Sequence, residues 1–441
     1  MKWIEYFGKP ESHYRGHGSL TNQPGQDAIP VSFEVVQVFD GRVFCECTST
    51  HDITGLPDEC DLTGHTEYGY DVTAYRLLIL GYHDSFRSNT HGVRAMVLDK
   101  VHIRTADQCL HDHSLETCFT LTNFRFPSFR NALQWTEGER KIIARPLPDH
   151  EENIKIIRAT QNSGVTTSLM IPEVKGVTQI PQVVELANKV CWLFSLAQGR
   201  GVHWVCCESM SEGQLVERCH QPSLLLPPTG PQLIPLREHK DIDDYVAQCL
   251  VSYDEKEQTW KVSELIDVYV RAVASSSFAE SKGLMLAVLM DIMQGIYLKA
   301  VGKEHLIDNE ISQEKLLTLK EGVGKCLEGL FPDDSARAEI GRYVQISQRP
   351  FFSDTVAAMC ESLGLRVPED EVRRFVRQRN ELTHCYRFFG NDAPDKICDE
   401  MMSLVSKIIL AMLGYNGYYY DWAIPSSGDW ENRRVKMQYA E

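Results

Sequence analysis

Short alternating runs of hydrophobic and polar residues fill the first half of the chain. Two extended runs between Val31 and Cys47 flank the dipeptide Asp40-Gly41, which is typical of a β-hairpin turn. Further runs rich in β-branched and aromatic residues lie at 75–80, 93–98, 119–121, 154–157, 165–171 and 202–207, separated by Gly, Asn, Asp and Pro. These runs predict an antiparallel module that is sandwich-like or barrel-like.

One helix is expected among these strands. Hydrophobic residues recur at helical spacing over 181–198, where Pro181 suits a first turn and Gly199 suits a C-terminal stop. The segment 222–240 is rich in proline, which interrupts both helices and sheet ladders. We interpret this segment as a linker between two domains.

After the linker the hydrophobic period becomes that of helices. Apolar positions predict helices at 241–253, 261–273, 277–301, 311–330, 333–347, 352–364, 368–387 and 394–413, with short loops between them. The predicted fold class is therefore a multidomain α+β protein. It comprises a strand-rich domain at 1–221, the linker at 222–240, and an all-α helical bundle with an aromatic tail at 241–441.

The composition is that of an ordinary globular protein, with 43% hydrophobic and 24% charged residues. The formal net charge of −16 argues against a protein that coats nucleic acid non-specifically. The apolar run 284–301 contains Asp291, Gln294 and Lys299, so we expect a buried helix and no membrane span. Residues 1–10 contain no apolar signal core, so we expect a cytoplasmic protein with reduced cysteines.

Several groups of cysteine and histidine raise the question of a zinc site. They are Cys45 and Cys47; Cys109, His111, His113 and Cys118; and Cys206, Cys207, Cys219 and His220. None shows the matched C-x2-4-C pairs of zinc fingers and ribbons, so we predict no metal site. The aromatic tail 415–422 is expected to pack onto the bundle, and stacking on RNA bases is the alternative.

The predicted helix 368–387 carries the most informative polar side chains. Its window 371–387 has a net charge of +3, against the trend of the acidic chain. Within it, Asn380 and His384 are four residues apart and share one helix face, and the long side chain of Arg379 can reach that face. Attack of an RNA 2′-hydroxyl on its own phosphate needs a proton acceptor, a proton donor and cations. Two copies of this set, facing each other in a dimer, meet that need.

Spacing alone does not distinguish this reading from two simpler ones. A solvated basic face, or a buried histidine bonded to a backbone carbonyl, would give the same pattern. However, the segment Arg379-Asn380-Glu381-Leu382-Thr383-His384 resembles the R-x4-H motif of HEPN domains, in which a small polar residue commonly follows the arginine. HEPN bundles often carry an acid on an earlier helix facing the motif, and Asp291 matches that position.

The order of the segments also resembles the ApeA family of HEPN proteins, which act in abortive infection against phage. A strand-rich module, a helix ending in SLAQGRGVHW, a proline-rich linker, helices and the segment GYNGYYYDW follow one another. The resemblance implies a homodimeric endoribonuclease, independent of metal and cofactors, that cleaves host RNA such as tRNA and leaves 2′,3′-cyclic phosphate ends. The strand-rich half would sense a phage component.

The same resemblance implies the roles of the site residues. His384 would act as base or acid, Arg379 would hold the phosphate, Asn380 would bind or orient, and Asp291 would complete the catalytic set. The other arginines expected to bind RNA are Arg373, Arg374, Arg377 and Arg387. Two alternatives stay open: a non-catalytic HEPN module that binds RNA or nucleotide and dimerises, and a surface or carbohydrate-binding β module with a helical dimerisation domain.

Overall fold

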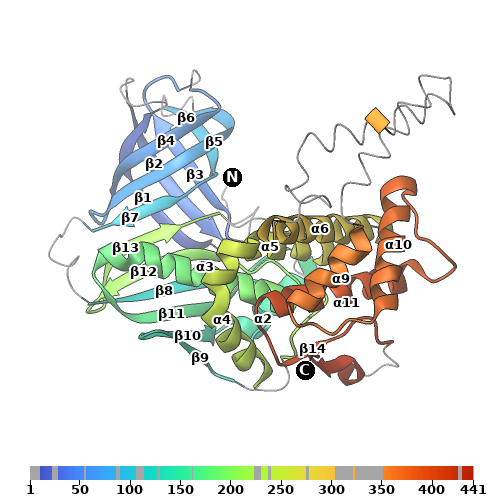
Figure 1. The fold of residues 1–441 in the computed structure, drawn as a ribbon. Coiled ribbons are helices and arrows are strands. Elements are labelled where there is room, and N and C mark those ends of the chain that lie inside the picture. The colour runs from blue at the N-terminus through green and yellow to red at the C-terminus, as the bar shows by residue number, and fades with distance from the viewer. Residues whose placement is uncertain are drawn as a thin grey trace, which may run out of the picture. The chain divides into compact units, whose positions relative to one another are not determined.

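The computed structural model describes residues 10–21, 28–53, 56–85, 90–105, 114–127, 130–160, 162–222, 230–236, 240–274, 278–302, 321–322, 351–425 and 430–440. The chain forms two compact units (Figure 1). The N-terminal unit consists of Met1–Tyr253, Tyr269–Ser276 and Gly417–Tyr420. The C-terminal unit consists of Asp254–Val268, Ser277–Asn416 and Asp421–Glu441. The architecture is α+β, as the hydrophobic pattern predicts.

A closed six-stranded barrel opens the N-terminal unit. Its strands are β1 (Pro10–Thr21), β2 (Ile29–Val38), β3 (Val43–Ser49), β4 (Glu59–Thr66), β5 (Asp71–Ser85) and β6 (Thr90–Val97). They pair in the order β4-β1-β2-β3-β6-β5, and the antiparallel pairing of β4 with β5 closes the ring. Alternating hydrophobic residues such as Phe33, Leu62 and Val93 fill the interior. The strand-rich prediction is thus confirmed in its barrel-like form.

Glycines allow a very close approach of β1 to β4 in this barrel. A Cβ atom on Gly16 would lie 2.0 Å from the carbonyl oxygen of His65, and one on Gly18 would lie 2.1 Å from that of Thr63. Any side chain at Gly16 or Gly18 would collide with the backbone of β4, so this close approach of β1 to β4 requires glycine at both positions. The predicted hairpin at Asp40-Gly41 joins β2 to β3, where Gly41 has a φ of 87°.

The sheet continues beyond the barrel through one shared strand. β5 also pairs with β7 (Val101–Arg104), and from there the sheet runs through the following strands. They are β13 (Gln214–His220), β12 (Trp204–Ser211), β8 (Ser114–Thr122), β11 (Val165–Lys175), β10 (Arg140–Pro146) and β9 (Leu133–Glu137). The predicted helix α3 (Ile180–Gln198), preceded by η2 (Val177–Gln179), packs on β8, β11 and β12. Gly199 ends it in the left-handed conformation, as expected.

One predicted strand is wrong. Residues 154–157 lie inside α2 (His150–Thr160), a helix with Glu151 and Glu152 in its first turn and Arg158 in its last turn. These charges match the helix dipole, and Ile157 is the residue of α2 that is buried. The short apolar run therefore belongs to an amphipathic surface helix. A run of four residues is too short to distinguish the helical period from the strand period.

The predicted linker is only partly described, at 222, 230–236 and 240. Leu233, Ile234 and Leu236 are buried. The backbone N–H groups of Leu233 and Ile234 donate to the carbonyl oxygen of Ala197, at 2.8 and 3.0 Å. This segment is therefore attached to the C-terminal end of α3.

A buried hydrogen-bond chain connects the barrel strands β1 and β2 to β13. Arg218 donates to the hydroxyl of Tyr14 at 2.6 Å, so this hydroxyl donates in turn to Nε2 of His220 at 2.9 Å. Nδ1 of His220 then donates to Oε1 of Gln37 at 2.8 Å. Both ring nitrogens are thus used by a neutral imidazole. Burial, with the charge of Arg218 as a second cause, lowers the pKa of His220 to about 3.

This histidine predicts a loss of stability in acid. The unfolded chain takes up a proton on His220 near the ordinary pKa of histidine, whereas the folded chain does not until about pH 3. Its contribution is complete above the unfolded value and falls as the pH decreases. Between about pH 7.5 and about pH 5 we expect it to cost about 2 kcal/mol of unfolding free energy.

Urea unfolding of the parent chain and of His220→Gln at both pH values measures this effect. The variant is expected to lose less stability on acidification than the parent. The exposed His51 provides the matched control, since His51→Gln is expected to follow the parent. Equal acid sensitivity of the parent and His220→Gln would contradict the interpretation.

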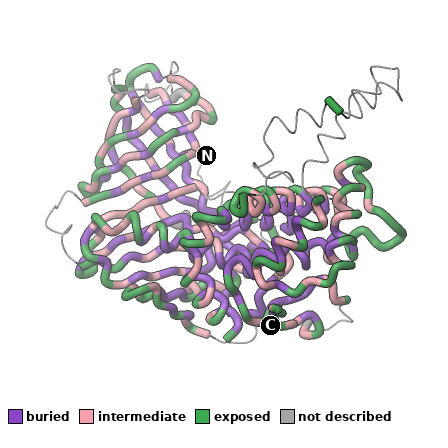
Figure 2. Tube along the Cα trace, viewed as in Figure 1, coloured by how far each residue is buried: buried purple, intermediate pink, exposed green. Residues whose placement is uncertain are grey.

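The C-terminal unit is built around helices. They are α6 (Ala279–Ala300), α9 (Phe352–Ser362), α10 (Glu369–Cys385) and α11 (Pro394–Met412), while α4 (Asp241–Trp260) and α5 (Val262–Ala274) contribute to both units. The short elements η3 (Trp430–Arg433) and β15 (Arg434–Lys436) also belong to this unit, whereas β14 (Tyr418–Tyr420) belongs to the N-terminal unit. α6 contacts α9, α10 and α11, and α11 is the most deeply buried of these helices (Figure 2). The predicted helices 311–330 and 333–347 lie outside the described residues, except for 321–322.

α6 is long and apolar enough to cross a membrane, judged by its length and composition alone. Buried core helices pass the same test, and α6 buries Leu286, Leu289, Met290 and Met293. In the aromatic tail, most rings are buried: Tyr415, Tyr419, Tyr420 and Trp422. Tyr415 and Trp422 belong to the C-terminal unit, as the packing prediction expects, whereas Tyr419 and Tyr420 fall in the N-terminal unit. Tyr418 is 41% exposed.

Candidate active site

The sequence of α10 explains how it holds its polar side chains in place. Pro368 occupies the N-cap position, and three acidic residues follow it in the first turn, near the positive end of the helix dipole. Val372, Phe375 and Leu382 form the buried stripe. The other faces of the helix border this stripe or face solvent. The predicted site residues lie on these faces.

Arg379 of α10 forms a bidentate ion pair with Asp291 of α6. Nε and one terminal nitrogen of Arg379 donate to Oδ1 of Asp291 at 3.2 and 3.1 Å, and that terminal nitrogen also lies 2.9 Å from Oδ2. The side chains are 25% and 35% exposed, so the pair is only partly screened by water. Two residues 88 positions apart in the sequence thus meet, as the resemblance implies.

Two further contacts fix the plane of the same guanidinium group. Its other terminal nitrogen donates to Oδ1 of Asn380 at 3.0 Å. The ring of Phe352, at the start of α9, lies under it with 4.8 Å between the guanidinium carbon and the ring centre. Arg379 is therefore held by three helices. The sequence pattern did not point to Phe352, because nothing local relates residue 352 to the motif.

His384 lies in the last turn of α10, one turn beyond Asn380, and both side chains are exposed. His384 makes no hydrogen bond or ion pair with the described residues. The helix ends directly afterwards at Tyr386, which has a left-handed φ of 53° and donates its N–H to the carbonyl oxygen of Leu382 at 3.2 Å. The imidazole is thus available to a ligand, while the reading of a buried, bonded histidine does not apply.

The four arginines predicted to bind RNA are exposed, but each has a local partner. Arg373 pairs with Glu369 at 2.5 Å, and Arg374 pairs with Asp370 at 3.3 Å. Arg387 lies 3.8 Å from Glu381, and the guanidinium carbon of Arg377 lies 3.4 Å above the ring of Phe389. The local charge of +3 is therefore offset by acids that the window 371–387 leaves out. Such exposed ion pairs contribute little to stability, so a phosphate can replace the acidic side chain as the partner of the arginine.

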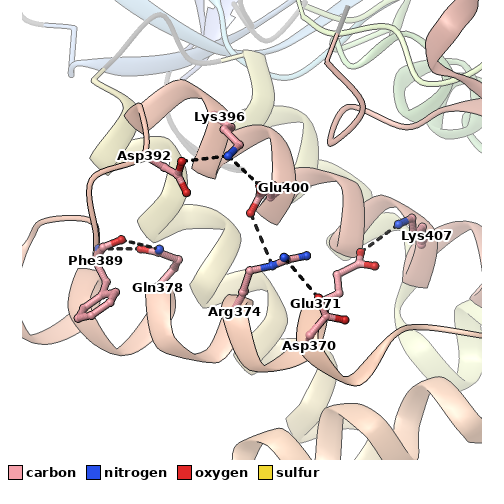
Figure 3. Close-up of polar contacts among 9 residues, drawn as sticks. All are labelled: Asp370, Glu371, Arg374, Gln378, Phe389, Asp392, Lys396, Glu400 and Lys407. Carbon is pink, nitrogen blue, oxygen red and sulfur yellow. Dashed lines mark hydrogen bonds and ion pairs between the residues drawn. The ribbon is translucent and has the colours of Figure 1, made fainter.

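A second polar cluster, which the sequence reading missed, connects α10 to α11 (Figure 3). Nζ of Lys407 lies 2.9 Å from Glu371 and 3.2 Å from Asp421, and Ser403 donates to Asp421 at 2.5 Å. Lys407, Glu371 and Asp421 border a cavity of about 220 Å³. Burial opposes the charge on Lys407, but the carboxylates of Asp421 and Glu371 outweigh it and raise the pKa of this amine.

The loop after α10 is fixed by one side chain of the helix (Figure 3). Gln378 donates to the carbonyl oxygen of Phe389 at 2.8 Å and accepts from its N–H at 2.7 Å. These two hydrogen bonds between the side-chain amide and the backbone of one loop residue hold the loop beside the helix. It also keeps the Phe389 ring in position against Arg377.

The cysteines of the described residues form no disulfide, and most are buried. Burial raises the pKa of several thiols, for example that of Cys191 to about 12, so these thiols are protonated and unreactive. Among the described residues, no three His, Cys, Asp or Glu side chains gather as metal ligands. Of the groups considered for zinc, Cys109, His111 and His113 lie outside the described residues.

The arrangement offers a fixed cation, an amide and an unengaged imidazole on one side of α10. These groups can bind a phosphate and move a proton beside it. No protein-family model, curated protein or solved structure matches this chain.

Proposed function

We propose that the C-terminal unit is an endoribonuclease of the HEPN type, acting in abortive infection against phage. The observation that supports this proposal is that Asp291, Asn380 and Phe352 fix the guanidinium group of Arg379 on α10, the helix that also carries the exposed His384 five residues further on. A helix that only presented a solvated basic face would not need a guanidinium group held from three helices. The intact motif and its acid on α6 agree with the resemblance.

In the proposed reaction, the RNA 2′-hydroxyl attacks the adjacent phosphorus, and the 5′-oxygen of the next nucleotide leaves. His384 takes the proton from the 2′-hydroxyl or gives one to the leaving oxygen. Arg379 stabilises the charge that develops on the phosphate oxygens, and Asn380 orients the phosphate or the ribose. The products carry a 2′,3′-cyclic phosphate and a 5′-hydroxyl, and the protein residues need no metal for these steps.

A homodimer belongs to this proposal, because one copy supplies one imidazole and the reaction uses both a proton acceptor and a proton donor. The substrate would be host RNA, and tRNA is the first to test. The N-terminal unit would sense a phage component and control the nuclease. This last part rests on the order of the segments alone.

Incubation of the purified full chain with total tRNA tests the proposal. We expect fragments with cyclic phosphate and 5′-hydroxyl ends, which ligation and phosphatase treatment identify. Binding without cleavage would favour the second candidate, a non-catalytic HEPN module that binds RNA or nucleotide and dimerises. One observation favours that candidate. The N–H groups of Arg379 already donate hydrogen bonds to Asp291 and Asn380, so a bound phosphate would have to share these donors with them.

Asp291 is expected to act through Arg379 and to have no direct role in proton transfer, because the guanidinium group engages both of its carboxylate oxygens. Replacing it in Asp291→Asn removes the charge of the pair and frees Arg379 to rotate. We expect single-turnover RNA cleavage to fall about 10²-fold, the cost of a misplaced catalytic group.

The exposed Asp354 of α9 provides a matched control, since Asp354→Asn is expected to cleave like the parent. Circular dichroism of both variants confirms that they fold. Full activity in folded Asp291→Asn would show that the ion pair does not position Arg379 for the reaction.

A further inference from the structure

Three side chains on two neighbouring strands of the N-terminal unit form a set that the proposed ribonuclease does not use. Sγ of Cys219 on β13 lies 3.8 Å from Nε2 of His102 on β7. Nδ1 of the same imidazole lies 3.1 Å from Oε1 of Glu217, which precedes Cys219 by two residues on β13. A thiol, an imidazole and a carboxylate in this order are the parts of an activated cysteine: a nucleophile, a base and a group that orients the base.

The pairing of β13 with β7 brings these residues together. Cys219 lies directly opposite His102 in this antiparallel pair, and Glu217 lies two positions away on the same strand, so the three side chains share one face of the sheet. On β7, Val101 and Ile103 point to the other face and belong to the core of the barrel. His102 therefore lies on the outside of the barrel, where its side chain is 24% exposed.

The contacts of Glu217 decide which nitrogen of His102 carries the hydrogen. Burial raises the pKa of Glu217, but hydrogen bonds from His102 and Arg104 outweigh burial and lower it, so the carboxylate is ionised. An ionised carboxylate only accepts hydrogen bonds, so Nδ1 of His102 donates to it. A neutral imidazole carries one hydrogen, and Nε2 is therefore free to accept the S–H of Cys219. Arg104 donates to the same Oε1 at 2.8 and 2.9 Å and holds the carboxylate in place.

The surroundings of Cys219 differ from those of the fully buried thiols. Burial raises the pKa of Cys219 to about 12, and the charge of Lys100 acts in the opposite direction. The resting group is therefore a thiol, and it reacts as a nucleophile when its proton passes to His102 during the attack. Cys219 is only half-buried, whereas Cys191 is buried and has no imidazole beside it, so a small oxidant can reach the sulfur of Cys219.

A second thiol lies next to Cys219. Cys207 of β12 is directly opposite Cys219 in the antiparallel pair of β12 and β13, so both side chains share one face. The Cα atoms of such a pair lie about 4.5 to 5.5 Å apart, within the range of about 4.4 to 6.8 Å that a disulfide spans. Burial, and then the neighbouring Cys219, raise the pKa of Cys207, which agrees with this proximity. Cys207 is 3% exposed, so an oxidant meets Cys219 first.

We propose that Cys219 is a site of oxidation by hydrogen peroxide, and that Cys207 converts the product into a disulfide between β12 and β13. In the first step, Nε2 of His102 takes the thiol proton while the sulfur of Cys219 attacks one peroxide oxygen. An S–O bond forms and the O–O bond breaks. The leaving hydroxide takes the proton from the imidazolium and becomes water, and Cys219 is then a sulfenic acid.

In the second step, the sulfur of Cys207 attacks the sulfur of the sulfenic acid on Cys219. The S–S bond forms, the S–O bond breaks, and the leaving hydroxide takes the proton of the Cys207 thiol to give a second water. The two thiols together lose two electrons and two protons, and one peroxide is reduced to two waters.

Treatment of the reduced full chain with hydrogen peroxide tests the proposal, with alkylation of the remaining thiols and mass spectrometry of the unreduced peptides. We expect a linked pair of peptides that contain Cys207 and Cys219, two hydrogen atoms lighter than the sum of the reduced peptides. Dithiothreitol should separate them. In Cys207→Ser the link cannot form, so dimedone is expected to trap the sulfenic acid on Cys219.

The role of His102 is tested by His102→Gln, which is expected to slow formation of the link about 10²-fold, because an amide cannot take the thiol proton. His65 of β4 provides a matched control: it bonds to the carboxylate of Asp71 at 2.7 Å but to no thiol among the described residues, so His65→Gln should react like the parent. Cys118 of β8 is also half-buried, but it points to the opposite face from Cys207, so Cys118→Ser should form the link at the parental rate.

Three results would overturn the proposal. The first is oxidation of the exposed Cys385 while Cys219 stays reduced, which would show that exposure alone decides which thiol reacts. The second is oxidation of Cys219 without a link to Cys207, which would remove the disulfide step. The third is a parental rate in His102→Gln with a parental circular dichroism spectrum, which would remove the base.

Discussion

Replacing His384 by alanine is expected to lower RNA cleavage about 10²- to 10⁴-fold, the usual contribution of a general acid or base. The imidazole is exposed in the last turn of α10 and makes no bond with the described residues, so the folded state does not depend on it. The variant should therefore fold and bind RNA like the parent. Rates of single-turnover cleavage and the affinity for uncleaved RNA measure the two effects separately.

Cys385 is the matched control for this substitution. It is also exposed and lies in the same turn, but it is not part of the motif, so Cys385→Ala is expected to retain full activity. Toxicity in cells should disappear together with cleavage in His384→Ala. Parental cleavage by a well-folded His384→Ala protein would exclude the proposed mechanism.

Replacing Lys407 by methionine is expected to destabilise the protein by about 3 to 5 kcal/mol, as when one partner is removed from a buried ion pair. Lys407 is 15% exposed and lies between Glu371 and Asp421, which are 16% and 12% exposed. Without the amine, the carboxylates of Glu371 and Asp421, which both border the cavity, repel each other. Urea unfolding near neutral pH, followed by circular dichroism, measures the loss.

Lys396 of the same helix provides the comparison. It pairs with Asp392 and Glu400, but at 52% exposure, so Lys396→Met is expected to leave the unfolding midpoint nearly unchanged. Equal effects of the two substitutions would show that burial does not strengthen the Lys407 cluster.

The parts of the fold that depend on local pattern were predictable from the sequence. The hairpin at Asp40-Gly41 and the helices α3, α10 and α11 follow from turn residues and from the period of the apolar positions. The run 154–157 was misread because four residues are too few to distinguish the two periods. Closure of the barrel through β4 and β5 could not be predicted, because it is decided by which strand edges meet in space.

In the candidate site, too, some features follow from local spacing in the sequence and others depend on contacts between distant residues. The helical spacing of Asn380 and His384 puts them on one face of α10, and the structure has them there. The pairing of Arg379 with Asp291 was expected only from the resemblance, since 88 residues separate them. The pairing of Arg373 with Glu369 and of Arg374 with Asp370 was available from the spacing of four residues, but the charge window began after those acids.

The shared strand β5 limits where the chain can be divided. Its residues 71–74 pair with both β4 and β7, and its later residues pair with β6. A fragment that ends after β6 would expose the β7 side of β5 as an open strand edge, which invites association with other chains. A soluble fragment of the barrel must therefore include β7, which β13 in turn covers. Expression of residues 10–222 as one piece respects these pairings.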